Sequence, residues 1–244
     1  MNPQSFAQFT SRIAGEVIVP GSQAYDHVRT VFNQEGSPAV IVRGQSNQDI
    51  VTTLRFAREH HLLLSVRSGG HGLSGLATNN GGLVLDLSAF KGVELLDRGQ
   101  HLVRIGAGTR WGEAAKALAA HGLALSSGDT NQVGVGGLTL GGGIGWMVRT
   151  YGLTIDSLQA AQLITADGRI LRVSAEEHPD LFWAIRGGGG NFGVVTSFDF
   201  SAQPCSTIVG GSVIYDAAEV ETVLTGWANA MQHSGLKERF IGCA

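Results

Sequence analysis

The chain has 244 residues, a hydrophobic content of 43% and a formal net charge of −3, and it contains no basic run, which argues against a nucleic-acid partner. Its 36 glycines are about twice the share that is usual in globular proteins. They gather in clusters without a period, which excludes collagen-like sequence and indicates backbone that turns sharply or approaches a ligand closely.

In residues 1–35 we expect a short helical lead-in followed by irregular structure. Residues 1–22 lack the basic and apolar regions of a signal peptide, and no apolar window of the sequence is long enough to span a bilayer. The two cysteines, Cys205 and Cys243, form neither a CxxC pair nor a metal-binding spacing. We therefore expect a soluble, cytoplasmic protein with two isolated thiols, no metal site and no membrane partner.

The next segment predicts a strand–helix–strand unit. A short apolar run at 39–42 indicates a strand, and Ser46 is a suitable N-cap for a helix that ends near His60. A second apolar run at 62–66 leads directly into the sequence Arg-Ser-Gly-Gly-His-Gly at 67–72. The unit therefore ends in a glycine loop.

The middle of the chain predicts further short elements. We expect strands at 83–87, 93–96 and 102–105, a helix at 110–120 that Gly122 ends, paired strands at 158–165 and 169–173, a helix at 178–186 and a strand at 192–200. The dipeptide Asp167-Gly168 has the residue types that a type I′ hairpin turn requires.

The pattern changes after about residue 205. Residues 208–215 indicate one strand and residues 217–231 one amphipathic helix. One strand and one helix cannot enclose a core of their own. We therefore interpret residues 206–244 as the start of an incomplete second domain.

The glycine loop at 67–72 has the composition of an anion site. Three glycines in four residues expose successive backbone N–H groups, which suits a phosphate or pyrophosphate. Arg67 could add positive charge, and His71 is a potential nucleophile or proton carrier. A tight turn with a solvated histidine is the simpler interpretation of these residues, and both stay open at this point.

A second glycine segment, at 133–145, has seven glycines among its thirteen residues. Glycine costs about 0.5–1 kcal/mol relative to alanine inside a helix or strand. Close approach of a ligand or of another backbone segment would compensate for that cost, and helix-on-sheet packing could explain some of the glycines. A nicotinamide-binding fold is disfavoured, because neither segment has the strand–GxGxxG–helix order of the dinucleotide fingerprint.

Four motifs in this order resemble the FAD-linked oxidases related to berberine bridge enzyme, within the vanillyl-alcohol-oxidase group of flavoproteins with a PCMH-type FAD-binding domain. The motifs are the first loop (67–72), the second glycine segment (134–145), Tyr151-Gly152-Leu153, and Asp180 to Gly189 with Asn191 to Val195. The resemblance implies an α+β fold with a two-subdomain FAD-binding domain at 36–205, a lead-in at 1–35, and the first strand and helix of a C-terminally truncated substrate domain at 206–244.

The resemblance also implies the cofactor, FAD, and its contacts. In this family the histidine of the first loop is bonded to the 8α-methyl group of the isoalloxazine ring, and His71 matches it. The second glycine segment would close over the ribose, diphosphate and ring. The positions that match FAD contacts are Arg67, Ser68, Gly69, Gly70, His71, Gly72, Ser74, Gly128, Thr130, Val133, Gly134, Gly136, Gly137, Gly141, Gly142, Gly145 and Val195.

Two departures from the family pattern change what we expect. Thr130 stands where many relatives carry a cysteine that forms a second link to the flavin, and a hydroxyl is far less nucleophilic than a thiolate, so we expect a single covalent link. The tyrosine base of the family belongs to a C-terminal segment that this chain does not reach, so no catalytic residue is identified. Trp146 and Tyr151 could line the flavin or pack beneath the loop.

The resemblance implies an oxidase that transfers hydride from a small organic substrate, such as a sugar, alcohol or amine, to FAD, with oxygen as the electron acceptor. The alternative is a flavin-binding fragment without activity, because the substrate domain and the base are absent. A partner chain could then supply the missing substrate-domain half. A glycine-rich protein that binds another nucleotide would explain the two loops but would give no role to His71.

Overall fold

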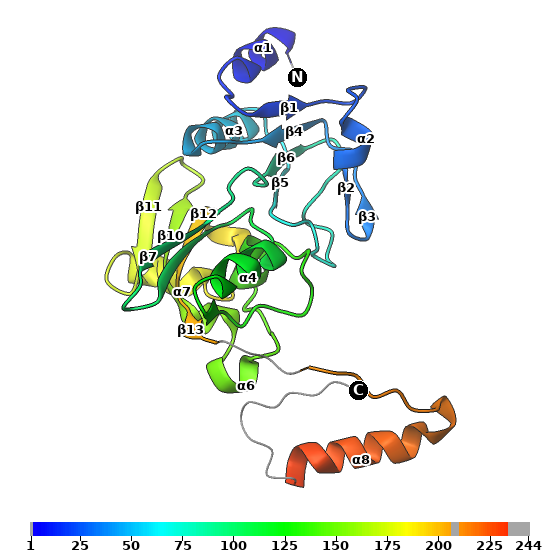
Figure 1. The fold of residues 1–244 in the computed structure, drawn as a ribbon. Coiled ribbons are helices and arrows are strands. Elements are labelled where there is room, and N and C mark those ends of the chain that lie inside the picture. Colours follow the sequence, from blue (N-terminus) through cyan, green and yellow to red (C-terminus); the bar gives the residue numbers. More distant parts are fainter. Residues whose placement is uncertain (1, 206–209, 234–244) are drawn as a thin grey trace.

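The computed structural model describes residues 2–205 and 210–233, which form an α+β structure with two sheets. The first sheet has the strand order β1-β4-β6-β5, and the second has the order β11-β10-β12-β8-β7. Figure 1 shows the first sheet in blue and cyan toward the N-terminal end of the molecule, with the green-to-yellow second sheet beside it. The two sheets agree with the expected pair of subdomains.

The first sheet contains the predicted strand–helix–strand unit. Its strands are β1 (Glu16–Ile18), β4 (Val40–Arg43), β5 (Leu64–Arg67) and β6 (Leu83–Asp86), and helix α3 (Asn47–Glu59) joins β4 to β5. The hydroxyl of Ser46 accepts a hydrogen bond from the Asp49 N–H (3.1 Å), so the predicted N-cap is confirmed. Strands β4 and β5 do not touch each other, because each pairs in parallel with β6 between them. Central, buried strands explain the continuous apolar runs of β4 and β6, whereas β5 is an edge strand with Val66 exposed.

The second sheet is antiparallel throughout. Its strands are β7 (Val93–Asp97), β8 (Leu102–Gly106), β10 (Leu158–Ile164), β11 (Ile170–Ser174) and β12 (Val194–Ser201). Strands β10 and β11 form the predicted hairpin, but the predicted type I′ turn is wrong: Gly168 has a φ of +87°, whereas Asp167 lacks the positive φ that this turn type also requires there, and the Gly168 N–H donates to the Thr165 carbonyl instead. The buried carboxylate of Asp199 on β12 accepts hydrogen bonds from Arg104 on the neighbouring strand β8 (2.7 and 2.9 Å) and from Arg172 on β11, on the far side of β10 (2.7 Å).

The connecting segments confirm two predicted helices and add two α-helices and two short 3-10 helices. They contain α4 (Trp111–Ala119), β9 (Leu123–Ala124), α5 (Val135–Leu140), α6 (Val148–Tyr151), η1 (Thr154–Ser157), α7 (Pro179–Ile185), η2 (Gly189–Phe192) and β13 (Gln203–Pro204). Helices α4 and α7 match the predicted helices at 110–120 and 178–186. Helix α5 lies inside the second glycine segment and was not predicted, because glycine has a low helix propensity.

The two sheets share a single buried core. Val42 and Leu85 of the first sheet belong to the same cluster as Ile105, Leu163 and Phe198 of the second. Each of these five side chains is fully buried. A shared core fixes the two subdomains relative to each other, and therefore also fixes the loops at their junction.

The lead-in is more ordered than the sequence indicates. It contains α1 (Pro3–Thr10), β1, α2 (Tyr25–Val28) and a hairpin of β2 (Thr30–Val31) and β3 (Gln34–Glu35). Phe9 of α1 stacks on Phe56 of α3 with ring centroids 4.0 Å apart. Strand β1 pairs with β4, so residues before 36 complete the first sheet.

The C-terminal part departs from the expected strand at 208–215. Residues 208 and 209 lie outside the described residues, and 210–215 form no strand. Among the described residues no strand lies beside this segment to supply hydrogen bonds, and Val213, Ile214 and Tyr215 are exposed. The predicted helix is confirmed as η3 (Ala217–Glu219) followed by α8 (Val220–His233), which Figure 1 shows in orange and red apart from both sheets. No helix of the described residues is long and apolar enough to cross a membrane.

Candidate functional site

The two glycine segments meet backbone to backbone. A methyl group added at Gly69 would lie 2.3 Å from the Gly134 nitrogen, and one added at Gly134 would lie 2.2 Å from the Gly69 nitrogen. No side chain larger than hydrogen fits at either position without separating the segments. Glycine at these two positions therefore serves contact within the protein.

One backbone carbonyl ties both segments to the second sheet. The Ala107 oxygen accepts hydrogen bonds from the Ser68 hydroxyl (2.6 Å) and from the Gly136 N–H (3.1 Å). The Ala107 N–H in turn donates to the Thr196 oxygen on β12 (2.9 Å). The junction is thereby fixed to a central strand, which gives a ligand a rigid surface to bind.

Arg67 has partners inside the protein. Its guanidinium donates to the Asp86 carboxylate from Nε (3.1 Å) and Nη2 (2.7 Å), and to the Val28 carbonyl from Nη1 (2.6 Å). Both side chains of this ion pair are about 7% exposed. The guanidinium that the sequence suggested as a phosphate contact is thus engaged beneath the loop, and contact of Arg67 with FAD stays a prediction.

The glycine loop presents unused backbone donors. Within the described residues, the N–H groups of Gly69, Gly70, His71 and Gly72 donate no hydrogen bond. Gly70 has a φ of +71°, which turns the loop sharply at its centre. Adjacent N–H groups in such a turn form a concavity that suits phosphate oxygens.

Two glycines border open space at this junction. Nothing lies within 4 Å of a methyl group added at Gly137, and at Gly72 the nearest atom, the Ser74 hydroxyl, is 3.9 Å away. Neither residue has the positive φ that would itself require glycine. The N–H of Gly137 also donates no hydrogen bond within the described residues. These open positions and unused donors fit a phosphate-bearing cofactor that lies against the backbone.

His71 lies at the tip of the loop and is partly exposed. Its imidazole stacks on the ring of Phe32, with centroids 4.8 Å apart and planes 19° from parallel. Phe32 belongs to the β2–β3 hairpin, which the sequence did not indicate as part of the site. Nothing in the pattern around Phe32 could have identified it, because a two-residue strand has no detectable period.

The remaining predicted contacts fall into three places. Val133 and Gly141 flank α5, and Gly142, with a φ of +106°, follows it. A methyl group at Gly145 would lie 2.6 Å from the Gly128 nitrogen, so these two glycines also meet backbone to backbone. Val195 is buried on β12, where its side chain belongs to the core.

Thr130 and Ser74 lie at the protein surface. The Thr130 hydroxyl donates a hydrogen bond to the neighbouring Asp129 carboxylate (3.1 Å). Of the predicted contacts, the structure brings together the loop at 68–72 and the segment at 134–137, while the side chain of Val195 lies in the core. Binding of FAD at any of these residues stays a prediction.

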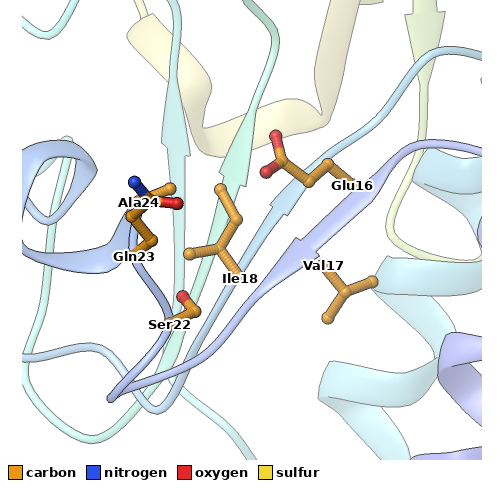
Figure 2. A pocket seen from close by; sticks show the side chains of 6 residues that line it. All are labelled: Glu16, Val17, Ile18, Ser22, Gln23 and Ala24. Atoms are coloured by element: carbon orange, nitrogen blue, oxygen red, sulfur yellow. The ribbon is translucent and has the colours of Figure 1, made fainter.

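Two cavities lie away from this junction. Figure 2 shows one of about 440 Å³ beside β1, lined by Glu16, Val17, Ile18, Ser22, Gln23 and Ala24. Its carboxylate, Glu16, forms an ion pair with Arg43. The other, of about 370 Å³, lies between α4 and the segment around Trp146, and Gly128 is the predicted site residue in its wall.

Comparison with known proteins gives a family match over more than half of the chain. The profile of the family described as "FAD binding domain" matches residues 38–174. An FAD-linked oxidoreductase of Bacillus subtilis is 38% identical over 226 residues, which cover 90% of this chain and 50% of that protein. The chain spans about half the length of the curated relatives it matches.

Two solved structures extend the comparison to the fold. The crystal structure of 6-hydroxy-D-nicotine oxidase from Arthrobacter nicotinovorans is 37% identical, with a TM-score of 0.85, and the match covers 90% of this chain and 49% of that one. Glucooligosaccharide oxidase from Acremonium strictum is 35% identical, with a TM-score of 0.75, over 80% and 42% of the two chains. The FAD of glucooligosaccharide oxidase is a 6-S-cysteinyl, 8α-N1-histidyl FAD.

Proposed function

The chain belongs to the FAD-linked oxidases related to berberine bridge enzyme and vanillyl-alcohol oxidase, and we propose that it binds FAD where its two glycine segments meet and bonds it covalently to His71. The observation that carries this proposal is the run of four unused backbone donors at 69–72, of which His71 is itself a member. Phosphate oxygens would accept from these donors, because a pyrophosphate has many lone pairs and no proton to compete for them.

The open surface at Gly137 and Gly72 supports the same location. A flat or extended cofactor can lie against backbone only where no Cβ intervenes, and these two positions leave that space free. The backbone contact between Gly69 and Gly134 and the hydrogen bond from Ser68 to the Ala107 carbonyl hold this surface in place before the cofactor binds. Preorganisation of this kind lowers the entropic cost of binding.

A single covalent link follows from Thr130. Glucooligosaccharide oxidase carries both a histidyl and a cysteinyl link. This chain has threonine at the position where the family pattern puts the cysteine, and a hydroxyl does not attack the flavin as a thiolate does. His71 would therefore be the one attachment point, and its imidazole must present a nitrogen with a free lone pair to the 8α-methyl carbon.

The proposed reaction is oxidation of a small organic substrate, such as a sugar, an alcohol or an amine. The bound FAD would supply a two-electron acceptor at N5, and molecular oxygen would take the electrons from it. The relatives act on an alkaloid and on oligosaccharides, so the substrate class is open.

Acid precipitation of the purified protein tests the covalent link. Yellow colour should stay with the precipitate of the wild type and pass into the supernatant for His71→Ala, while His121→Ala, an exposed histidine outside the junction, should behave like the wild type. Colour wholly in the wild-type supernatant would contradict the covalent link, and a purified protein without flavin that takes up none would contradict FAD binding. Peroxide release with a sugar or alcohol would separate an active oxidase from a protein that only holds the flavin.

A further inference from the structure

The β2–β3 hairpin presents an aromatic ring to the proposed attachment residue. The Phe32 ring covers one face of the His71 imidazole at 4.8 Å between centroids and 19° between planes. Phe32 is nevertheless 63% exposed, so burial in the core does not explain where its ring lies. Within the described residues, the one aromatic contact of Phe32 is its face-to-face stacking on His71.

The hairpin is fastened to the glycine loop at several points. The Phe32 N–H donates to the Gly70 carbonyl (3.0 Å), next to His71 in sequence. A methyl group at Gly75 would lie 1.7 Å from the Gln34 side-chain oxygen, so the loop and the hairpin are in close contact. At the base of the hairpin, Arg67 donates to the Val28 carbonyl (2.6 Å). The backbone of Phe32 is thus held at a fixed place relative to the loop.

A histidine at a loop tip otherwise has free rotation about both side-chain bonds. No side-chain hydrogen bond of His71 exists within the described residues, so no acceptor or donor sets the plane of its ring. A stacked aromatic pair favours parallel or offset ring planes, by an amount equivalent to about a two- to tenfold change in population. The ring of Phe32 therefore restricts the imidazole to orientations with one face covered and the nitrogens directed away from the stack.

We propose that Phe32 is a positioning residue for covalent flavin attachment, which holds the His71 imidazole in the plane from which a ring nitrogen reaches the 8α-methyl carbon. This inference rests on the proposed function. The attachment breaks one C–H bond of the methyl group and one N–H bond of the imidazole and forms one C–N bond. The two electrons and two protons released pass to molecular oxygen, which gives hydrogen peroxide. Phe32 takes part in none of these bonds.

The rate of covalent attachment in the reconstituted full chain tests the role of Phe32. Apoprotein from riboflavin-starved cells is mixed with FAD in air, and two quantities are followed: total flavin that stays with the protein on gel filtration, and acid-precipitable flavin over time. Phe32→Leu should bind FAD with an affinity within about twofold of the wild type but attach it about two- to tenfold more slowly. Phe32→Tyr should restore the wild-type rate, because the stacking ring is kept.

Leu63→Ala is the matched control, because Leu63 is 65% exposed and lies at the opposite end of β5 from the loop. It should attach FAD at the wild-type rate. An unchanged rate for Phe32→Leu, or failure of Phe32→Tyr to restore it, would overturn the positioning role alone. A wild type that binds FAD but never yields acid-stable flavin would overturn the covalent link and this inference together.

A second measurement covers the case in which Phe32→Leu does not fold. In the wild-type apoprotein, the ring protons of Phe32 and His71 should give nuclear Overhauser contacts, and the His71 ring protons should be shifted upfield by the covering ring. Absence of both signals would overturn the proposal without any variant.

Discussion

Gly137→Ala should have opposite effects on the stability of the apoprotein and on FAD binding. Gly137 is in the first half of α5, has no positive φ, and has nothing within 4 Å of the position that a methyl group would take. Alanine is favoured over glycine in a helix by about 0.5–1 kcal/mol. Because no atom of the described protein stands in the way, the apoprotein should gain stability of this order.

The size of the two effects can be stated. For a protein of this length the gain corresponds to a rise of roughly 1–4 °C in the midpoint of apoprotein unfolding. The same methyl group would occupy the surface on which we expect the cofactor to lie. An extra methyl group in a well-packed contact typically costs about 1–3 kcal/mol of free energy. FAD affinity should therefore fall by about five- to more than a hundredfold.

Thermal unfolding of the apoprotein, followed by circular dichroism, and titration with FAD, followed by flavin fluorescence, measure the two effects separately. Gly226→Ala is the control for binding: Gly226 also lies within a helix and has nothing within 4 Å, but it belongs to α8, and FAD affinity should not change. A Gly137→Ala variant with wild-type FAD affinity would refute the location of the site. A less stable apoprotein would refute the claim that the space at Gly137 is open.

Two further predictions concern residues at or beneath the junction, and a third concerns Asp199 in the second sheet. Gly134→Ala should prevent stable folding or FAD uptake, since the added methyl group would lie 2.2 Å from the Gly69 nitrogen; a soluble variant with normal flavin content would contradict this contact. Asp86→Ala should lower the free energy of unfolding by about 3–5 kcal/mol in denaturant titration, because it leaves the Arg67 guanidinium buried without its carboxylate. Burial alone would raise the pKa of Asp199, but hydrogen bonds from its two arginines outweigh burial and hold the pKa below its usual range. Its ion pairs thus stabilise the fold above the ordinary aspartate pKa of about 4, and the stability advantage of the wild type over Asp199→Asn should shrink as pH falls below that value; an advantage that does not depend on pH would contradict the assignment.

The sequence predicts those elements whose signal is local. The apolar runs of β4 and β6 are continuous because both strands are buried on both faces, and the Asp167-Gly168 turn requires a positive φ that few residue types adopt. Strands β1, β2 and β3 have two or three residues each, too few to show a period. Strand β1 forms because β4 supplies a partner from elsewhere in the chain, and β2 and β3 pair with each other in a hairpin whose Phe32 N–H bonds the Gly70 carbonyl.

The sequence predicts which residue types form the candidate site, but it does not predict what each residue contacts there. Glycine content marked both segments, but whether a glycine touches protein, as Gly69 does, or borders open space, as Gly137 does, depends on what the fold puts opposite it. Arg67 looked like a phosphate contact because of its neighbours in sequence, yet its guanidinium pairs with Asp86, nineteen positions later. Phe32 could not be linked to His71 without the hairpin that brings them together.

The Ala107 carbonyl has a consequence for how variation in this protein is interpreted. It joins both glycine segments, through Ser68 and Gly136, to the sheet, but it does so with an atom that every amino acid carries. A survey of substitutions at Ala107 would measure only how much side-chain volume the core tolerates, since Ala107 is fully buried. It would leave the hydrogen bonds of the Ala107 carbonyl in place. Ser68→Ala removes the side-chain donor to this carbonyl, but the hydrogen bond from the Gly136 N–H can be removed only by altering the backbone, for example by replacing the amide of Val135 and Gly136 with an ester.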